Sequence, residues 1–287
     1  MAIRCGFIGL GIMGNALARN LVPNGLPATV FDLDEAAMAE VAKTGARPVA
    51  SPAEVATAAD VIGVCVPADE HVRAVLCGED GVFAHAAKGT VVVIHSTIHP
   101  QTFVEMAERG AASGIDVLEV PVAGGPVRAA EGNAYFIVAG EQDAIDKARP
   151  YFDALANQVT LAGELGNAAK LKLALNVLTN VSFSAALEGL LLAKAMGLSQ
   201  ELFEEGGGAT TMLNALHLQY LSTHKMPEEA RRSEGLQDYM RGRMEIAQKD
   251  LALALEMARK HGVAMPVTGV VSQVIARIYG VHDDGLR

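Results

Sequence analysis

The stretch that decides the fold is Ile3-Arg4-Cys5-Gly6-Phe7-Ile8-Gly9-Leu10-Gly11-Ile12-Met13-Gly14. Residues 3–8 predict a buried strand, and three glycines in the pattern GxGxxG then lead into a helical segment. The first glycine permits a tight turn, the second lets the backbone approach a diphosphate, and the third lets helix and strand pack closely. We therefore predict a dinucleotide site, with the diphosphate at the helix N-terminus. Its residues are Gly9, Leu10, Gly11, Ile12, Met13 and Gly14.

Asp32 decides which dinucleotide is expected. It ends the second predicted strand, 18 residues after Gly14, near the usual separation of about 20. A carboxylate there accepts hydrogen bonds from the ribose hydroxyls and repels a 2′-phosphate. No arginine follows directly, so NAD is expected ahead of NADP. In the alternative, Asp34 caps the next helix and Asp32 is a solvated strand end.

Apolar strands alternate with helical segments through residues 1–163. Strands are expected at Ile3–Ile8, Ala28–Phe31, Val61–Val66, Val91–His95, Val117–Val120 and Tyr135–Ala139. Helices are expected at Ile12–Leu21, Glu35–Thr44, Pro52–Ala58, Asp69–Leu76, Pro100–Ala111 and Gln142–Ala154. Asp34, Ser51 and His99 mark three of the helix starts. Strands apolar along their whole length and separated by helices predict an α/β, doubly wound, mostly parallel Rossmann sheet.

Residues 164–287 contain no convincing strand, so we predict an all-helical second domain built on one long helix. Helices are expected at Ala168–Met196, Gln200–Glu205, Thr210–Ser222, Leu236–His261 and Val267–Tyr279. Residues 206–208 and 224–234 are expected to be loops. The first helix would run roughly 42 Å and is apolar on most faces, which favours burial partly by a second subunit. A homodimer or homotetramer is expected, and a fully intramolecular helix is the alternative.

Composition excludes several kinds of partner. The net charge is −10 and no basic cluster stands out, which argues against nucleic acid. The three cysteines show no CxxC spacing, so neither a metal site nor a disulfide is expected. Between Lys172 and Glu188 lie 15 uncharged residues, fewer than the roughly 20 of a membrane span. We therefore expect a cytoplasmic protein with a buried apolar helix.

Polar and glycine-rich segments follow several predicted strands, at the edge where cofactors bind to such sheets. Val66-Pro67 and Ser96-Thr97 end two of them, and Thr97 can reach the nicotinamide ribose or the substrate. Ala123-Gly124-Gly125 follows another, where successive backbone N–H groups can hold a substrate carboxylate. The alternatives are that Ser96 and Thr97 cap the next helix, and that the glycines form a turn without a ligand.

Two lysines at the start of the long apolar helix need a reason. Lys172 and Asn176 are four residues apart and share one face, whereas Lys170 points about 200° away. Lys172 and Asn176 can therefore converge on one ligand, with Lys172 as a general acid or base. The alternative is that both lysines extend to solvent at a helix end. Lys249, beside Asp250 on a later helix, is a weaker candidate for contact with the cofactor.

These segments together resemble the β-hydroxyacid dehydrogenase family, which includes 3-hydroxyisobutyrate dehydrogenases and the glyoxylate and succinic semialdehyde reductases. The shared segments run in one order along nearly the whole chain. They are Gly9–Gly14, Ser96-Thr97, Pro121–Gly125, Gly166–Asn176 and Lys249-Asp250. The resemblance implies that Lys172 transfers the proton of the substrate oxygen and that Asn176 holds the substrate. It also implies that the Pro121–Gly125 turn binds the carboxylate, that Lys249 lies near the nicotinamide, and that two helical domains interlock.

The sequence departs from the family at two positions. Ala123 stands where the family turn usually has a serine that contacts the substrate. Gly242 stands where the family often has phenylalanine, seven residues before Lys249, so Arg241 or Arg243 can enter a more open pocket. Both departures favour a bulkier or more anionic substrate.

The sequence thus predicts hydride transfer between NAD(H) and a small β-hydroxyacid, or the matching semialdehyde. Imine reductases of the same fold are one alternative, although they generally lack the lysine that matches Lys172. A non-catalytic NAD-binding protein is the other, and Ala123 keeps it open.

Overall fold

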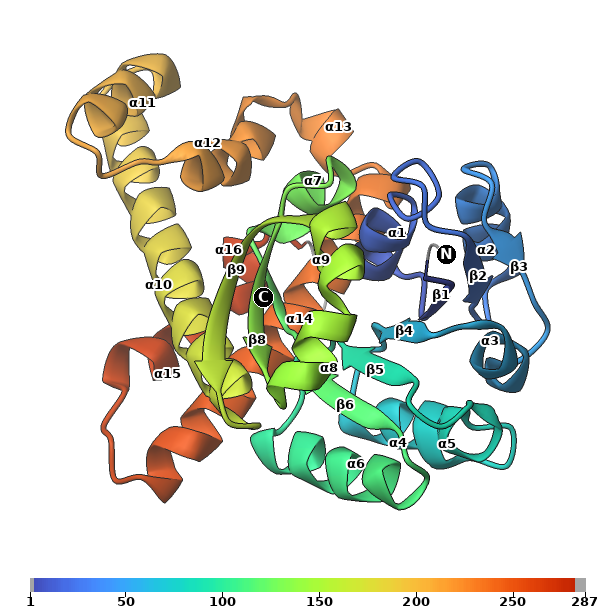
Figure 1. The fold of residues 1–287 in the computed structure, drawn as a ribbon. Helices are drawn as coiled ribbons and strands as arrows, with labels where there is room; N and C mark the ends of the chain where they lie inside the picture. The colour runs from blue at the N-terminus through green and yellow to red at the C-terminus, as the bar shows by residue number, and fades with distance from the viewer. Residues whose placement is uncertain (1–2, 282–287) are drawn as a thin grey trace. The chain divides into compact units, whose positions relative to one another are not determined.

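The computed structural model describes residues 3–281. The chain divides into two compact units, Met1–Lys172 and Leu173–Arg287, and Figure 1 shows the long helix α10 (Asn167–Ala195) as one continuous element. The strands are β1 Cys5–Ile8, β2 Ala28–Phe31, β3 Arg47–Pro48, β4 Val61–Val64, β5 Val91–Ile94, β6 Asp116–Glu119, β7 Val122–Ala123, β8 Ala134–Ala139 and β9 Ala156–Gly163. All of these strands lie in the first unit.

The sheet confirms the predicted doubly wound architecture. Its order is β3-β2-β1-β4-β5-β6-β8-β7, and β9 pairs with β8. The strands from β3 to β6 are parallel, whereas β8 runs antiparallel to β6 and β7. The chain order reverses at β1, which lies between β2 and β4. The carboxyl ends of these strands therefore form the crevice where such sheets bind cofactors.

Helices cover both faces of this sheet, because side chains on adjacent strand residues point to opposite faces. On β6, Val117 packs into one core and Leu118 into the other. Helices α1, α2 and α7 to α9 contribute to the core of Leu118, and α3 to α6 to the core of Val117. The helices are α1 Ile12–Ala18, α2 Glu35–Ala42, α3 Pro52–Ala58, α4 Asp69–Cys77, α5 Val82–His85, α6 Pro100–Ala112, α7 Gly125–Ala130, α8 Gln142–Lys147 and α9 Arg149–Leu155.

The second unit is helical throughout its described residues, as predicted. After α10 come α11 Gln200–Ala209, α12 Ala215–Leu221, the 3₁₀ turn η1 Ser222–Lys225, α13 Glu228–Arg231, α14 Glu234–Lys260, α15 Pro266–Gln273 and α16 Ile275–Ile278. The stripe Ala247, Leu251, Ala254 and Ala258 recurs at helical spacing and is the buried face of α14. Phe183 and Leu187 of α10 and Ile275 and Ile278 of α16 belong to the core of this unit.

Several boundaries differ from the prediction. The expected helix at 142–154 is two helices that meet at Ala148, because Pro150 lies in the first turn of α9 and cannot continue the bonding of α8. The expected loop at 206–208 is wrong, since α11 runs through these glycines. A Cβ on Gly207 would lie 2.5 Å from Leu213, so close packing accounts for glycine there. The expected loop at 224–234 contains α13.

The long helix α10 is only partly buried within this chain. Its length and apolar composition match those of a membrane span, and they equally match those of a core helix in a soluble protein. Within the chain, 28% of its most apolar 18 residues are buried. Leu178 is 62% exposed and Leu192 is 61% exposed. Within the described residues, α10 therefore keeps large apolar side chains exposed.

Candidate active site

Two glycines of the glycine-rich turn, Gly9 and Gly14, are required by close backbone contacts. Gly9 has φ +91°, and a Cβ there would lie 2.4 Å from the carbonyl oxygen of Cys65. A Cβ on Gly14 would lie 1.9 Å from the oxygen of Gly9. Gly11 has open space around it and is the N-cap of α1, where no described side chain caps the helix. The turn therefore fits a diphosphate, because the backbone N–H groups of α1 are accessible to an anion.

Asp32 is bound to this turn. Its carboxylate accepts hydrogen bonds from the backbone N–H of Leu10 and, at 2.9 Å, from that of Asp34. Asp32 is half-buried, so it is not the solvated strand end of the alternative prediction. Asp34 caps α2 by accepting from Ala36, as its position suggested. A carboxylate is thus fixed beside the first glycines, where an adenosine ribose binds in this fold.

The ends of β4 and β5 are joined by Ser96. Its buried hydroxyl oxygen accepts from the backbone N–H of Val66 at 2.9 Å, and Thr97 next to it is half-buried. The cap of α6 is His99, whose Nδ1 accepts from Gln101 at 3.1 Å. The alternative that Ser96 and Thr97 cap this helix is therefore wrong. Pro67, which follows β4 at the same edge of the sheet, is exposed.

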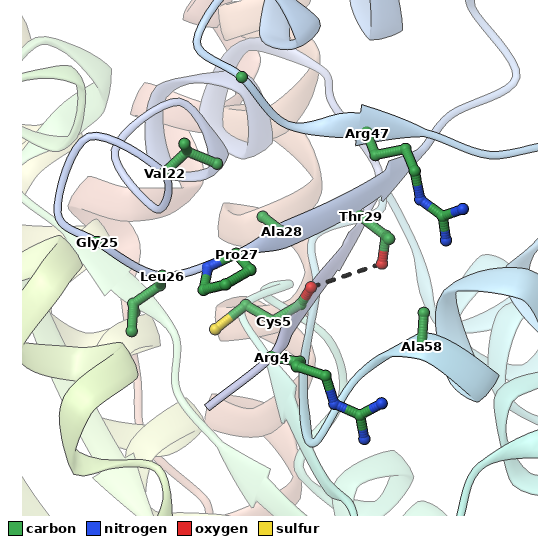
Figure 2. Close-up of a pocket in the computed structure, with 11 residues that line it drawn as sticks. Arg4, Cys5, Val22, Gly25, Leu26, Pro27, Ala28, Thr29, Arg47 and Ala58 are labelled. Atoms are coloured by element: carbon green, nitrogen blue, oxygen red, sulfur yellow. Dashed lines mark hydrogen bonds between the residues drawn. The ribbon is translucent and has the colours of Figure 1, made fainter. Parts of the chain in front are cut away.

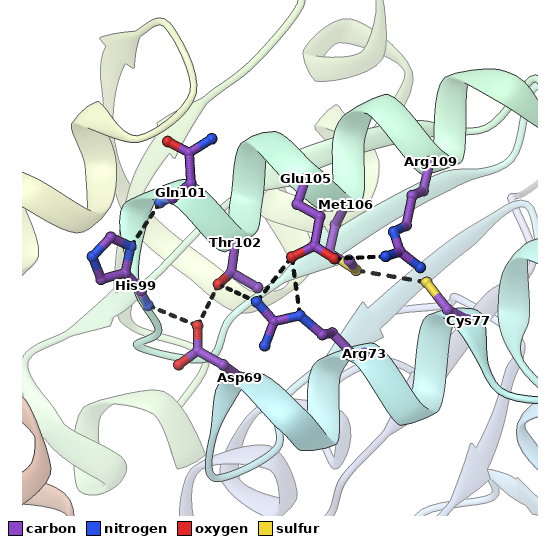
Figure 3. Close-up of polar contacts among 9 residues, drawn as sticks. All are labelled: Asp69, Arg73, Cys77, His99, Gln101, Thr102, Glu105, Met106 and Arg109. Carbon is purple, nitrogen blue, oxygen red and sulfur yellow. Dashed lines mark hydrogen bonds and ion pairs between the residues drawn. The ribbon is translucent and has the colours of Figure 1, made fainter.

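A polar network fixes α4 against α6 near Thr97 (Figure 3). Asp69 accepts from the backbone N–H of His99 at 3.1 Å and from the hydroxyl of Thr102. Arg73 donates to Glu105 through two nitrogens, at 2.8 and 2.9 Å. These contacts hold the segment that carries Thr97 without involving Thr97 itself.

The backbone conformation of the second glycine turn, Ala123-Gly124-Gly125, explains why it contains two glycines. Gly124 and Gly125 have φ +94° and +82°, a region that other residues rarely adopt. Ala123 is half-buried on β7 and pairs with Tyr135 of β8. The conformation thus requires both glycines whether or not a carboxylate binds.

The two lysines of α10 differ in their surroundings. Lys170 is exposed, and its ammonium group donates to Asn167 at 3.1 Å. Lys172 is half-buried, on the side of the helix that the 3.6-residue period places away from Lys170. Asn176 is half-buried one turn further along.

Asp250 orients Asn176. The amide Nδ2 of Asn176 donates to Asp250 at 2.6 Å, and Asp250 is 3% exposed. Lys249 Nζ lies 2.9 Å from the other carboxylate oxygen of Asp250. The sequence singled out the Lys249-Asp250 pair but not this contact, which fixes the amide of Asn176 from a position 74 residues away.

Glu119 at the end of β6 was missed. It is fully buried, and burial raises the pKa of its carboxyl to about 7. The available signal was a carboxylate within the apolar run that was predicted as the strand Val117–Val120, since carboxylates are rarely buried without partners.

One cavity of the first unit lies away from these residues. It measures about 580 Å³, is open, and is lined at the start of β1 and β2 by Arg4, Cys5, Pro27 and Ala28 (Figure 2). In a parallel sheet the amino ends of the strands lie at the edge opposite the cofactor crevice. The candidate active site is therefore assigned from the carboxyl-end residues rather than from this cavity.

A Rossmann sheet with an open glycine turn and a carboxylate at the end of β2 defines a dinucleotide-binding domain. Residues 4–163 match the NAD binding domain of 6-phosphogluconate dehydrogenase. Residues 166–285 match the family described as NAD-binding of NADP-dependent 3-hydroxyisobutyrate dehydrogenase. The chain belongs to the 3-hydroxyisobutyrate dehydrogenase-like β-hydroxyacid dehydrogenase family. Oxidoreductases of this family act on CH–OH groups.

Three similar proteins illustrate the family. The chain is 30% identical to the 2-(hydroxymethyl)glutarate dehydrogenase of Eubacterium barkeri, over 95% of this chain and 88% of that protein. It is 32% identical to the NAD-dependent L-serine dehydrogenase of Pseudomonas aeruginosa, over 91% and 87%. The structure of the Mycobacterium tuberculosis 3-hydroxyisobutyrate dehydrogenase with L-serine has a TM-score of 0.78 at 26% identity, over 99% of this chain and 96% of that chain.

Proposed function

We propose that the chain interconverts a small β-hydroxyacid and its semialdehyde with NAD(H), and that Lys172 is the general acid/base. The observation that carries this assignment is the contrast between the two lysines at the start of α10. Lys170 is exposed and bonded to Asn167, whereas Lys172 is half-buried one helical turn before Asn176. An ammonium group that shares a helix face with an amide can transfer a proton to or from a ligand bound there.

Each residue of the proposed site has a separate role in the reaction. When bound, the nicotinamide supplies the chemistry of hydride transfer. In the oxidation direction, neutral Lys172 accepts the proton of the substrate hydroxyl as the C–H bond breaks and the carbonyl forms. Asn176 holds the substrate oxygen with the part of its amide that Asp250 does not occupy. The backbone N–H groups of Gly124 and Gly125 hold the carboxylate, and Thr97 contacts the substrate or the nicotinamide ribose.

Asp32 supports a preference for NAD. Its carboxylate is held beside Leu10 by backbone hydrogen bonds, so it cannot move away from a 2′-phosphate without losing them. Lys249 is assigned to the cofactor more weakly, because it already pairs with Asp250.

The second unit supports a substrate with an additional anionic group. Arg243 follows Gly242, and its guanidinium carbon lies 5.8 Å from the ring centroids of both Tyr239 and Tyr279. Such stacking holds an arginine in place while leaving its N–H groups able to donate. Ala123 removes a hydroxyl from the turn, which also favours a substrate other than a simple hydroxyacid.

We also propose that the protein is a homodimer or homotetramer. The exposed leucines of α10 include Leu178 and Leu192, and α15 exposes Val267 and Val270. Apolar side chains gathered along exposed helix faces are typical of subunit interfaces.

A substrate panel tests this function. Purified protein is assayed with 3-hydroxyisobutyrate, L-serine, 2-(hydroxymethyl)glutarate and short semialdehydes, each with NAD(H) and NADP(H), by absorbance of the reduced cofactor. We expect turnover of hydroxyacids with NAD, and the highest kcat/KM for a substrate with two carboxylates. Turnover of imines alone would favour the imine reductase alternative, and cofactor binding without any turnover would favour the non-catalytic one. A clear preference for NADP would contradict the role of Asp32.

A further inference from the structure

The start of α10 is capped by a side chain from the sheet. Glu119, the last residue of β6, is fully buried. One of its carboxylate oxygens accepts from the backbone N–H of Gly166 at 2.5 Å, and the other accepts from that of Ala169. The two donors are 47 and 50 residues away in the sequence. The first turn of α10 is thereby tied to the carboxyl edge of the sheet.

Local residues do not replace this cap. A helix leaves its first N–H groups without intrahelical partners, and a nearby side chain usually accepts from them. Asn167, the first residue of α10, instead donates its amide to Ala162 and accepts from Lys170. Gly166 enters the helix with φ +91°. The cap therefore depends on Glu119.

We propose that Glu119 is a positioning residue, whose ionised carboxylate holds the first turn of α10 and so fixes Lys172 at the site of proton transfer. The inference rests on the function proposed for Lys172. Lys172 follows Ala169 by three residues, about 4.5 Å along the helix axis. Within so short a distance, fraying of the first turn also changes the direction of the Lys172 side chain.

Protonation of Glu119 weakens this cap. Burial raises the pKa of Glu119 to about 7 although backbone N–H groups and Lys170 act to lower it. The residues that pair with Glu119 in the sheet, Ile94 and Ala139, are apolar. The charged side chain of the first unit that acts on Glu119 is Lys170. His95 lies next to Ile94 but is bonded to Tyr151 and Val120 instead. A protonated carboxyl presents a hydroxyl to one of the two N–H groups, and that bond is lost.

Hydrogen exchange in the protein without cofactor tests the cap directly. In Glu119→Gln, the side chain keeps its size but offers one oxygen and an NH₂ group to two N–H donors. At pH 8 the amides of residues 166–169 should exchange about tenfold faster or more than in the wild type. At pH 5.5 the two proteins should differ little there. The matched control is Glu164→Gln, which removes an exposed carboxylate two residues before Gly166 and should leave the exchange unchanged.

The wild type provides a test that requires no variant. Protection of amides 166–169, measured relative to amides of α6 in the same sample, should increase as the pH rises through about 7. Kinetics then link the cap to catalysis. We expect kcat of the wild type to follow an ionisation near 7 that Glu119→Gln lacks and Glu119→Asp retains, with KM little changed.

Unchanged protection across pH 6–8 in the wild type would overturn the proposal, as would wild-type exchange at 166–169 in Glu119→Gln. A separate outcome concerns the proposed function alone. If a variant without Lys172 keeps full turnover while the exchange results hold, the cap exists but Lys172 is not the acid/base.

Discussion

The contact between Asn176 and Asp250 gives the most quantitative prediction. Asp250 is 3% exposed and accepts from Asn176 at 2.6 Å while its other oxygen faces Lys249 at 2.9 Å. In Asp250→Asn the single amide oxygen can serve only one of these two partners. A hydrogen bond to a charged group contributes about 1.5–3 kcal/mol and a neutral one about 1 kcal/mol. We therefore expect the free energy of unfolding to fall by about 0.5–2 kcal/mol, with little from the partly exposed Lys249 pair.

The same change should lower catalysis, because Asn176 loses its fixed orientation. A loss of about 0.5–2 kcal/mol in the transition state corresponds to a decrease of about 2- to 30-fold in kcat/KM. Urea unfolding and steady-state kinetics measure the two effects. Asp238→Asn, an exposed carboxylate of the same helix, is the matched control and should change neither.

The exchanged pair, Asn176→Asp with Asp250→Asn, separates orientation from chemistry. The amide of residue 250 then donates to a carboxylate at 176, so the free energy of unfolding should return to within about 1 kcal/mol of the wild type. Turnover should stay low, because residue 176 has no donor left for the substrate. Wild-type kcat/KM in Asp250→Asn, or full activity in the exchanged pair, would refute this account of Asn176.

Two further predictions concern the cofactor turn and pH. Gly14→Ala places a methyl group 1.9 Å from the oxygen of Gly9. Titration calorimetry should therefore show NAD binding weakened by about tenfold or more, and the melting temperature of the protein should fall. The control is Gly11→Ala, which should keep the wild-type melting temperature because Gly11 has open space around it. Burial lowers the pKa of His95 to about 4 and raises that of Glu119 to about 7. Between about pH 4.5 and 6.5, His95 is therefore protonated only in the unfolded chain, and Glu119 is protonated only in the folded protein. The first effect makes stability rise with pH and the second makes it fall, so the two offset each other. In Glu119→Gln only the effect of His95 remains. Urea unfolding should then show the free energy of unfolding rising by up to about 1.4 kcal/mol per pH unit across this pH range. An equally steep rise in the wild type would contradict the raised pKa of Glu119.

Local signals accounted for most of the Rossmann unit. Apolar runs gave the central strands, and Asp34, Ser51 and His99 cap the helices that they were expected to start. The strands that were missed lack such a signal. β3 and β7 have two residues each, and β9 is largely exposed along its length. Pairing with a neighbouring strand, rather than composition, makes these segments strands.

The candidate site could be predicted only where its residues are close in sequence. The glycine turn and the spacing of Lys172 and Asn176 follow from a motif and from the helical period. The carboxylates that hold this site cannot be found in that way. Glu119 and Asp250 contact residues that lie 47 to 74 positions away in the sequence. The residues next to these carboxylates do not indicate which backbone N–H groups or which side-chain amide will donate to them.

The central claim is that Lys172 transfers the proton, and single-turnover kinetics of Lys172→Ala with prebound NAD tests it most directly. The account predicts NAD affinity within about threefold of the wild type, and a hydride-transfer rate lower by about 10²- to 10⁴-fold that an added primary amine partly restores. Lys260→Ala, which removes an exposed lysine of α14, should match the wild type. A single-turnover rate in Lys172→Ala within a few-fold of the wild type would contradict the claim.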